Sequence, residues 1–519
     1  MQKTIIENGS SASSSDEHKV AVKMVGIVKR FPGVIANDHI DFEVHVGEVH
    51  ALLGENGAGK TTLMNILYGL YKPDEGEIYV WGRKVKIHSP RDAIRLGIGM
   101  VHQHFMLIPN FTVAENIVLG TKLPRAPLLD IKEAYRRIEE LSKKYGLKVD
   151  PKAYIWQLSV GEQQRVEILK LLYRNARILI LDEPTSVLTP SETVELFKAL
   201  RRMANEGRAV IFITHKLKEV FAVADRVTVL RRGKRIATLP VSQTNERELA
   251  RMMVGREVFL TIPRTPVKPG KEVLIVENVL AMGDKGLPAL KGVSLRVREG
   301  EIVGVAGVAG NGQKELVEVI IGLRKVVKGK IIINGIDVTN KSPEFIQKLG
   351  VAYIPENRMR GVIPDLPILK NLIIGMHKEP PIAQRLTINF KNAQNFARKL
   401  IREYNIVAPS EFTPVKYLSG GNIQRLVLAR ELSRKPKLLI AEQPTRGLDI
   451  GATEYVRKKI LEQRNRGCGI LLISEDLDEI VSMSDRIIVM YEGSIVGELS
   501  AKEADLETLG LLMSGALKR

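Results

Sequence analysis

A glycine-rich segment around residue 57 has the composition and spacing of a phosphate-binding loop. It follows the apolar run 49–53 and precedes a predicted helix at 60–70, which is the strand–loop–helix context that such a loop requires. Glycines allow successive backbone N–H groups to face phosphate oxygens, and the helix N-terminus adds positive potential. We expect Lys60 to neutralise the β and γ phosphates of a nucleotide and the Thr61 hydroxyl to hold Mg²⁺. The residues predicted to bind the phosphates are Gly54, Glu55, Asn56, Gly57, Ala58, Gly59, Lys60, Thr61 and Thr62.

Two carboxylates follow the apolar run 178–181, which is predicted to be a buried strand. Asp182 is placed there to hold Mg²⁺, and Glu183 to accept a proton from an attacking water. An Asp-Glu pair after a strand is often only a cap, but with a phosphate-binding loop upstream it indicates phosphoryl transfer. His215 follows the next apolar run, 210–213, and its place in the series predicts contact with the γ-phosphate, although a single histidine is more often structural.

Two single residues extend the predicted site. Gln103 follows the apolar run 98–101, where its amide can contact Mg²⁺ or the attacking water. Phe31 lies upstream of the glycine-rich segment, where an aromatic ring can stack on adenine, although a core position is the commoner role for a lone aromatic residue. The predicted catalytic set is therefore Glu183, His215 and Gln103, and the predicted metal set is Thr61, Gln103 and Asp182.

The chain repeats itself once. Four pairs of matching positions are each separated by 260 residues, which indicates two copies of one domain rather than a short-period solenoid. The matched positions include Asp182 and Glu442, Ser159 and Ser419, His215 and Glu475, and Gly255 and Gly515. Each half alternates strand-like apolar runs with helical patterns, and the clearest helix is predicted at 131–145. The predicted fold class is α/β, with two tandem domains that each have a mixed sheet core and a helical insert.

The joint between the halves is short and breaks any periodic pattern. The residues that interrupt it are Pro263, Pro266, Pro269 and Gly270. The N-terminal segment is serine-rich and has no apolar core of signal-peptide length, so we predict a disordered tail. The predicted segments are the tail at 1–19, a first domain at 20–259, a linker at 260–271 and a second domain at 272–516.

Composition restricts the setting of the protein. The 519 residues are 44% hydrophobic and 26% charged, as expected of globular domains. No stretch reaches the length of about 18 apolar residues that is needed to span a bilayer. The single cysteine, Cys468, excludes an intrachain disulfide, which fits a reducing cytoplasm. The formal net charge of +19 suits a nucleic-acid surface, a surface that faces anionic lipids, or a solvated surface with a polyphosphate ligand, and charge alone does not separate these alternatives.

Two further segments carry a family resemblance. Residues 158–164 (Leu-Ser-Val-Gly-Glu-Gln-Gln) and 418–424 (Leu-Ser-Gly-Gly-Asn-Ile-Gln) resemble the signature motif of ABC ATPases, and all the motifs follow in the order of that family. The resemblance covers both halves and implies tandem P-loop NTPase domains of the ABC type. The fused pair is similar to importers of simple sugars and nucleosides, and segments 99–107 and 354–358 look most like the nucleoside branch. The signature residues implied to bind ATP are Ser419, Gly420, Gly421 and Asn422.

This resemblance implies a role and a set of partners. In the family, two such domains pack head to tail, and ATP with Mg²⁺ lies between the P-loop of one half and the signature of the other. The implied function is ATP hydrolysis that energises uptake of a nucleoside or a simple sugar such as ribose or galactose. The implied partners are two transmembrane permease subunits and, indirectly, an extracytoplasmic solute-binding protein, with no nucleic acid. The chain would then be a peripheral protein at the cytoplasmic face of the cell membrane.

The second half departs from the family pattern at its nucleotide-binding positions. Gln313 replaces the P-loop lysine, Lys314 replaces the threonine, and Gln443 replaces the catalytic base. The second half also has Glu442 in place of Asp182, Glu356 in place of Gln103, and Glu475 in place of His215. The first half departs at its signature, where Val160 replaces a glycine. It also has Thr189 at the position of Asp449, which resembles the cross-interface loop of the family. Because the resemblance pairs each P-loop with the opposite signature, these changes accumulate at one site. We predict one hydrolytic site per chain, formed by the first P-loop and the second signature.

A rival prediction is a soluble ATPase of the same tandem type that acts on ribosomes or nucleic acid, for which a net charge of +19 is suited. Such proteins resemble this chain in their ATPase motifs, but they typically carry a long charged helical arm between the halves and two competent sites. Here the joint is short and the second site is degenerate. A scaffold without hydrolysis conflicts with the complete motifs of the first half, so the importer subunit is the favoured prediction.

Overall fold

The computed structural model describes residues 20–103, 105–121, 131–186, 188, 190–257, 265–308, 310–384, 387–501, 503–513 and 515–517. The chain divides between residues 258 and 259 into two compact units, and hydrophobic cores lie within each of them. The predicted tail at 1–19, residues 260–264 of the predicted linker, and Thr189 lie outside the described residues. Both units combine mixed sheets with helices, which confirms the predicted α/β class.

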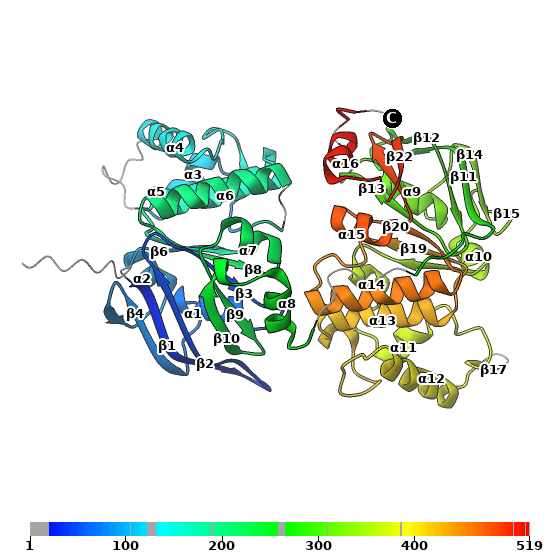
Figure 1. Cartoon of the computed structure of the whole chain (residues 1–519), viewed down its shortest axis with the longest axis horizontal. Helices are drawn as coiled ribbons and strands as arrows, with labels where there is room; N and C mark the ends of the chain where they lie inside the picture. The colour runs from blue at the N-terminus through cyan, green and yellow to red at the C-terminus, as the bar shows by residue number, and fades with distance from the viewer. Residues whose placement is uncertain are drawn as a thin grey trace, which may run out of the picture. The chain divides into compact units, whose positions relative to one another are not determined.

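A six-stranded sheet forms the centre of the first unit (Figure 1). Its strands are β3 (Val49–Leu53), β6 (Ile98–Val101), β7 (Ile178–Asp182), β8 (Ala209–Thr214), β9 (Arg226–Arg231) and β10 (Lys234–Pro240). The strand order is β10-β9-β3-β8-β7-β6, and only β10 runs antiparallel to its neighbour. Every residue of β3, β7 and β8 is buried, as continuous apolar runs predict for strands covered on both faces. Because these three strands are parallel neighbours, their carboxyl ends meet at one edge of the sheet.

One face of this sheet is covered by a second, antiparallel sheet and a helix. The strands of the antiparallel sheet are β1 (Val20–Phe31), β2 (Val34–His45), β4 (Glu75–Val80) and β5 (Arg83–Val85), in the order β2-β1-β4-β5. Helix α1 (Lys60–Leu67) contributes to the same core as both sheets. It is shorter than the predicted 60–70 because Gly69 adopts a left-handed conformation with φ of 82° and ends the helix.

Helices cover the opposite face. They are α3 (Val113–Val118), α4 (Ile131–Tyr145), α5 (Val160–Tyr173) and α6 (Pro190–Asn205). Their apolar sides share a core with β7 and β8, and α4 has the bounds predicted for the clearest helix. Ser159 caps α5 and forms a capping box with Glu162, so the signature segment starts a helix. The remaining helices of this unit are α2 (Pro90–Arg95), α7 (Leu217–Val223) and α8 (Glu246–Val254), with short 3-10 turns η1 (Ile155–Gln157) and η2 (Val241–Gln243).

The second unit repeats this arrangement. Its six-stranded sheet contains β13 (Ile302–Ala306), β16 (Val351–Ile354), β19 (Leu438–Glu442), β20 (Gly469–Ile473), β21 (Arg486–Tyr491) and β22 (Ser494–Ser500), in the order β16-β19-β20-β13-β21-β22. The antiparallel sheet has the order β12-β11-β14-β15, from β11 (Glu272–Met282), β12 (Pro288–Arg298), β14 (Lys328–Ile333) and β15 (Ile336–Asp337). A two-stranded ribbon joins β17 (Ala383–Gln384) to β18 (Thr387–Ile388).

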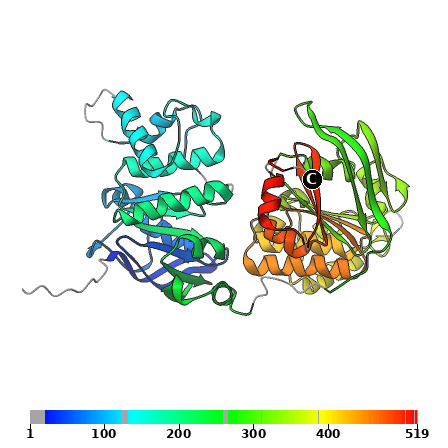
Figure 2. The same cartoon turned by 45° about the horizontal axis from the view of Figure 1, so that its top comes forward.

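The helices of the second unit divide between the two faces in the same way. They are α9 (Gln313–Ile320), α10 (Pro343–Lys348), α11 (Ile368–Ile373), α12 (Phe390–Glu403), α13 (Gly420–Ser433), α14 (Ile450–Asn465), α15 (Leu477–Met483) and α16 (Leu506–Met513), with turns η3 (Arg358–Gly361) and η4 (Val415–Tyr417). In Figure 2 the green antiparallel strands lie on one side of the sheet, and the gold and orange helices α13 and α14 lie on the other. Across the described part of the chain, no helix combines the length and apolar character needed to cross a bilayer.

Candidate active site

The glycine-rich loop of the first unit runs from β3 into the N-terminus of α1. Gly59 precedes α1 with φ of 99°, and a Cβ at this residue would lie 2.7 Å from Nδ2 of Asn37. Glycine is therefore required at this position. The fully buried Asn37 side chain on β2 donates a hydrogen bond of 3.0 Å to the Gly59 carbonyl. The antiparallel sheet thus fixes the end of the loop where the phosphates are predicted to bind.

The Lys60 ammonium folds back over this loop. Its side chain is buried, and Nζ donates hydrogen bonds to the carbonyls of Gly54 at 2.6 Å and Glu55 at 2.9 Å. An ammonium beside the phosphate-binding loop is well suited to a phosphate, because a hydrogen bond between two charged groups is stronger than one to a neutral carbonyl. This geometry is compatible with the predicted role of Lys60.

Asp182 and Thr61 form the pair predicted to hold Mg²⁺. Burial raises the pKa of Asp182 at the end of β7, while a hydrogen bond with the Thr61 hydroxyl and the charge of Lys60 act in the opposite direction. A hydroxyl and a carboxylate are hard oxygen ligands of the kind that Mg²⁺ prefers, and a divalent cation would offset the cost of burying the carboxylate. The residues present therefore fit the predicted metal ion. The third residue of the predicted metal set, Gln103, contacts the neighbouring carboxylate instead.

Glu183 is held by two of the other predicted residues. Its Oε1 lies 3.0 Å from Nδ1 of His215, and its Oε2 accepts a hydrogen bond of 3.2 Å from Nε2 of Gln103. The hydrogen bond with His215 lowers the pKa of Glu183, so the side chain is an ionised carboxylate near neutral pH. The backbone of Glu183 has φ of 47°, a conformation that costs energy for a glutamate and is typical of functional positions. The structure thus brings the predicted catalytic set together at the edge where β7 and β8 end.

Phe31 lies at the end of β1, in the hairpin whose second strand contacts Gly59. Its ring is 36% exposed and packs edge-on against Tyr71, with ring centroids 5.4 Å apart. The Lys29 ammonium lies 5.5 Å from the centre of the same ring. A partly exposed ring on this hairpin is compatible with stacking on a base, and the predicted adenine contact stays a prediction.

The corresponding loop of the second unit has different polar chemistry. Gln313 occupies the position that Lys60 has in the first unit. Its Nε2 donates a hydrogen bond of 3.1 Å to the carbonyl of Val308. Nζ of Lys314 forms an ion pair of 3.1 Å with Asp284, which lies between β11 and β12. The hydrogen bond and charge of Lys314 help to lower the pKa of Asp284, although Arg324 contributes most. The predicted loss of both the P-loop ammonium and the metal-binding hydroxyl is thus visible in the side-chain contacts.

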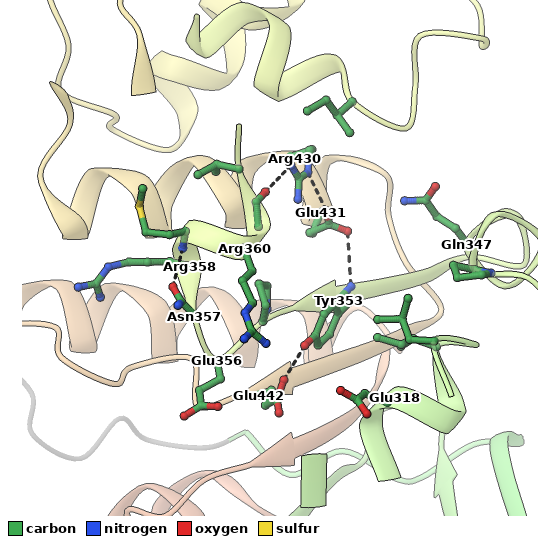
Figure 3. A pocket seen from close by; sticks show the side chains of 18 of the residues that line it. Glu318, Gln347, Tyr353, Glu356, Asn357, Arg358, Arg360, Arg430, Glu431 and Glu442 are labelled. Atoms are coloured by element: carbon green, nitrogen blue, oxygen red, sulfur yellow. Dashed lines mark hydrogen bonds and ion pairs between the residues drawn. The ribbon is translucent and has the colours of Figure 1, made fainter. Parts of the chain in front are cut away.

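The acidic strand end of the second unit also differs. Oε2 of Glu442 accepts a hydrogen bond of 2.5 Å from the Tyr353 hydroxyl, and burial raises the pKa of this carboxylate. Gln443 has the same left-handed backbone as Glu183, but its amide oxygen accepts from the backbone N–H of Glu475. Figure 3 shows Tyr353, Glu356 and Glu442 around a cavity of about 1210 Å³. An amide in place of a carboxylate cannot accept a proton from water near neutral pH.

The two signature segments differ in charge at their helix N-termini. In the first unit, Glu162 accepts hydrogen bonds from the Ser159 N–H at 2.8 Å and hydroxyl at 2.9 Å, and a Cβ on Gly161 would collide with the Glu192 carboxylate. In the second unit, the amide of Asn422 donates to the Ser419 hydroxyl at 3.0 Å, and the neutral Ala452 faces Gly421. The N-terminus of α5 thus lies beside two carboxylates, one of them paired with Arg165, whereas that of α13 lies beside a neutral amide and an alanine.

Two residues near the signatures were missed by the sequence reasoning. Glu192, which forms an ion pair with Arg165, places a carboxylate beside Gly161 of the first signature, and Arg358 places a guanidinium beside Gly420 of the second. Comparing residues across the repeat at the offset of 260 would have found the contrast between Glu192 and Ala452. Arg358 gives no such signal, because it lies in a turn whose contact with the signature arises only from folding.

Comparison with known proteins supports the assignment of both halves. The family model described as ABC transporter matches residues 37–186 and 290–446. The glucose import ATP-binding protein TsgD13 of Haloferax volcanii is 50% identical, over 95% of this chain and 96% of that protein. The guanosine import ATP-binding protein NupO of Bacillus subtilis is 48% identical, over 96% of this chain and 98% of that protein. The nucleoside import ATP-binding protein NupA of Lactococcus lactis is 47% identical, over 96% and 99%.

Among solved structures, the archaeal ribosome recycling factor aABCE1, in complex with the ribosomal stalk protein aP1, has a TM-score of 0.64 and 21% identity, over 94% of this chain and 92% of that chain. At this identity the similarity shows the fold alone. The matches in both halves and along nearly the whole length confirm the predicted family. This chain belongs to the ABC transporter family, as an ATPase with two copies of the ABC domain.

Proposed function

We propose that this chain is the ATP-hydrolysing subunit of an importer and has one hydrolytic site. The observation that carries the proposal is the placement of Glu183, an ionised carboxylate held by His215 and Gln103 at the strand edge that also bears Asp182. This is the position from which a base can orient a water against the terminal phosphate of ATP bound at the loop before α1.

The residues of the first unit divide the work of hydrolysis. Lys60 and the N-terminus of α1 bind and orient the phosphates, and the Thr61–Asp182 pair would hold Mg²⁺. When bound, Mg²⁺ neutralises charge that develops on the phosphate oxygens. Glu183 holds the attacking water and accepts its proton, and His215 and Gln103 fix the direction of the carboxylate. The signature at Ser419 to Asn422 donates N–H and O–H groups to the γ-phosphate from the opposite side.

The second P-loop is proposed to lack turnover. Gln313 supplies no charge, the Lys314 ammonium pairs with Asp284, and Gln443 is not a base. The first signature, which would serve this site, carries the carboxylates of Glu162 and Glu192 near its N-terminus. ATP binding would close the two units head to tail, and hydrolysis would reopen them.

The proposed solute is a nucleoside or a simple sugar, since the relatives are named as import proteins for glucose, guanosine and nucleosides. The proposed partners are two transmembrane permease subunits, with a solute-binding protein acting indirectly and no nucleic acid. The chain would then be peripheral at the cytoplasmic face of the cell membrane. Mass spectrometry of what the purified solute-binding protein retains would distinguish the two solute classes.

The importer role can be tested against the ribosome or nucleic-acid role with one assay. Steady-state ATP hydrolysis by the purified chain is measured with vesicles that contain the permease subunits, with empty vesicles, and with RNA. We expect stimulation by the permease vesicles alone. Stimulation by RNA, with no response to the permease vesicles, would instead support the rival function, and a chain without any hydrolysis would contradict both.

A further inference from the structure

The guanidinium of Arg358 lies flat against the signature of the second unit. A Cβ built on Gly420 would lie 2.9 Å from Nη2, 3.0 Å from Cζ and 3.1 Å from Nε of Arg358. These nearly equal distances mean that the guanidinium plane faces the backbone of Gly420. The space that a side chain would take at Gly420 is thus filled by Arg358, which starts the turn η3 (Figure 3).

Arg358 also joins this signature to the turn that follows β19. Its Nη1 donates a hydrogen bond of 3.2 Å to the carbonyl of Arg446, and Gly447 lies against the same guanidinium. The side chain of Arg446 in turn forms an ion pair with Glu356, two residues before Arg358. One guanidinium therefore holds three segments together: the loop after β16, the turn after β19 and the N-terminus of α13.

The positive charge of Arg358 is not neutralised by this arrangement. No carboxylate in the described part of the chain forms an ion pair with it, since Glu356 pairs with Arg446. Burial alone lowers the pKa of Arg358, but a guanidinium remains charged in proteins. An unpaired, half-buried cation beside a helix N-terminus strengthens the positive potential that an incoming phosphate meets.

The first signature has a valine where the second has the glycine that contacts Arg358. Val160 occupies the position of Gly420, and its side chain is 47% exposed. The charged groups near the first signature are the carboxylate of Glu162 and the ion pair of Glu192 with Arg165. The contact between Arg358 and Gly420 therefore occurs at the signature that the proposed function assigns to the hydrolytic site.

We propose that Arg358 is a positioning residue for ATP hydrolysis. It fixes Gly420 and Gly421 at the distance and angle from which the signature meets the γ-phosphate, and it adds positive potential there. The proposal rests on the proposed function, because it assumes that the second signature acts on ATP bound to the first P-loop. Since that P-loop supplies most contacts to the nucleotide, loss of Arg358 slows turnover and leaves ATP binding nearly unchanged.

The test compares Arg358→Ala with Arg360→Ala in the full-length chain. Arg360 lies in the same turn, lines the same cavity and is exposed, which makes it a matched control. Arg358→Ala is expected to lower kcat about 10-fold or more with KM for ATP changed less than about 3-fold, whereas Arg360→Ala stays within about 2-fold of the parent chain. Thermal melting of each variant is recorded. If Arg358→Ala melts early, Arg358→Lys replaces it, because lysine keeps the charge but cannot lie flat or donate as a fork.

A second variant separates positioning from general damage. Gly420→Ala forces a Cβ against the guanidinium, so the two substitutions should be coupled. We expect Gly420→Ala to slow the parent chain about 5-fold or more, and to slow the Arg358→Ala chain less than about 2-fold. Additive losses, or an unchanged kcat in both Arg358 variants, would overturn the inference. If Glu183→Gln also left kcat unchanged, the proposed function itself would fail, which distinguishes the two outcomes.

Discussion

The Glu183 carboxylate is oriented by His215, whose Nδ1 lies 3.0 Å from Oε1. Both residues follow neighbouring parallel strands, β7 and β8, and the backbone of Glu183 is in the left-handed region. In the second unit, Gln443 and Glu475 occupy the positions of Glu183 and His215. Their contact is a hydrogen bond from the backbone N–H of Glu475 to the amide oxygen of Gln443. Identical backbone geometry thus supports different chemistry in the two units.

This contact predicts the acid side of the pH–rate profile. The hydrogen bond with His215 lowers the pKa of Glu183 below its ordinary value of 4.5, and the carboxylate is the active form. The rate should therefore fall only when the pH drops through this lowered pKa. Substitution His215→Ala removes the bond, so the acid limb of kcat/KM should move to higher pH as the overall rate falls. An acid limb at the same pH in both proteins would show that His215 does not control the ionisation of Glu183.

Lys60 should determine ATP affinity, whereas Gln313, at the matching position of the second unit, should not. A hydrogen bond to a charged group contributes about 1.5–3 kcal/mol, so Lys60→Ala should weaken nucleotide binding by about 10- to 100-fold. Gln313→Ala removes a neutral amide bonded to the Val308 carbonyl and should change binding by less than about 2-fold. Titration with a fluorescent ATP analogue measures both. Equal losses from the two variants would contradict the assignment of the first P-loop.

The charge contrast between the signatures predicts the effect of one exchange. Asn422→Glu gives the second signature the carboxylate that Glu162 supplies to the first, where it completes a capping box with Ser159. Repulsion between this carboxylate and the γ-phosphate should lower kcat/KM about 10-fold. The matched variant Glu162→Gln should change hydrolysis by less than about 2-fold. A full rate for Asn422→Glu would indicate that the second signature does not meet the phosphate.

The packing of α4 against the end of α6 should depend on Glu206. Burial opposes ionisation, but hydrogen bonds from Tyr145, Lys144 and Arg208 prevail and lower the pKa of Glu206 from 4.5 to about 2. A lowered pKa stabilises the folded state fully above pH 4.5, and this contribution is lost as the pH falls through about 2. Glu206→Gln should therefore lower the melting temperature at pH 7, with the difference from the parent shrinking towards pH 3. A constant difference over this range would contradict the ionic contribution.

Much of the first unit could be predicted from sequence because its signals are local. The runs 49–53, 98–101 and 178–181 form the strands β3, β6 and β7, since continuous apolar residues suit strands covered on both faces. The strand edges then bring Gln103, Glu183 and His215 together, although they are far apart in the chain. The end of α1 was misplaced because a left-handed Gly69 outweighs the apolar pattern that continues to Leu70.

The contacts that could not be predicted depend on tertiary packing. The edge-on packing of Phe31 on Tyr71, and the ion pair of Lys314 with Asp284, join residues that carry no mutual spacing signal. The contact between Arg358 and Gly420 is of the same kind. A motif identifies which residues bear chemistry, but the neighbours that set their charge and direction come from other elements of the fold.

The most direct measurement is steady-state ATP hydrolysis by two variants of matched positions, Glu183→Gln and Gln443→Ala. If the chain has one hydrolytic site, Glu183→Gln should lower kcat by about 10²-fold or more, because the base is lost while ATP still binds. Gln443→Ala should stay within about 2-fold of the parent chain, since its amide accepts no proton. Similar losses in both variants, or hydrolysis that persists in Glu183→Gln, would contradict the single-site account.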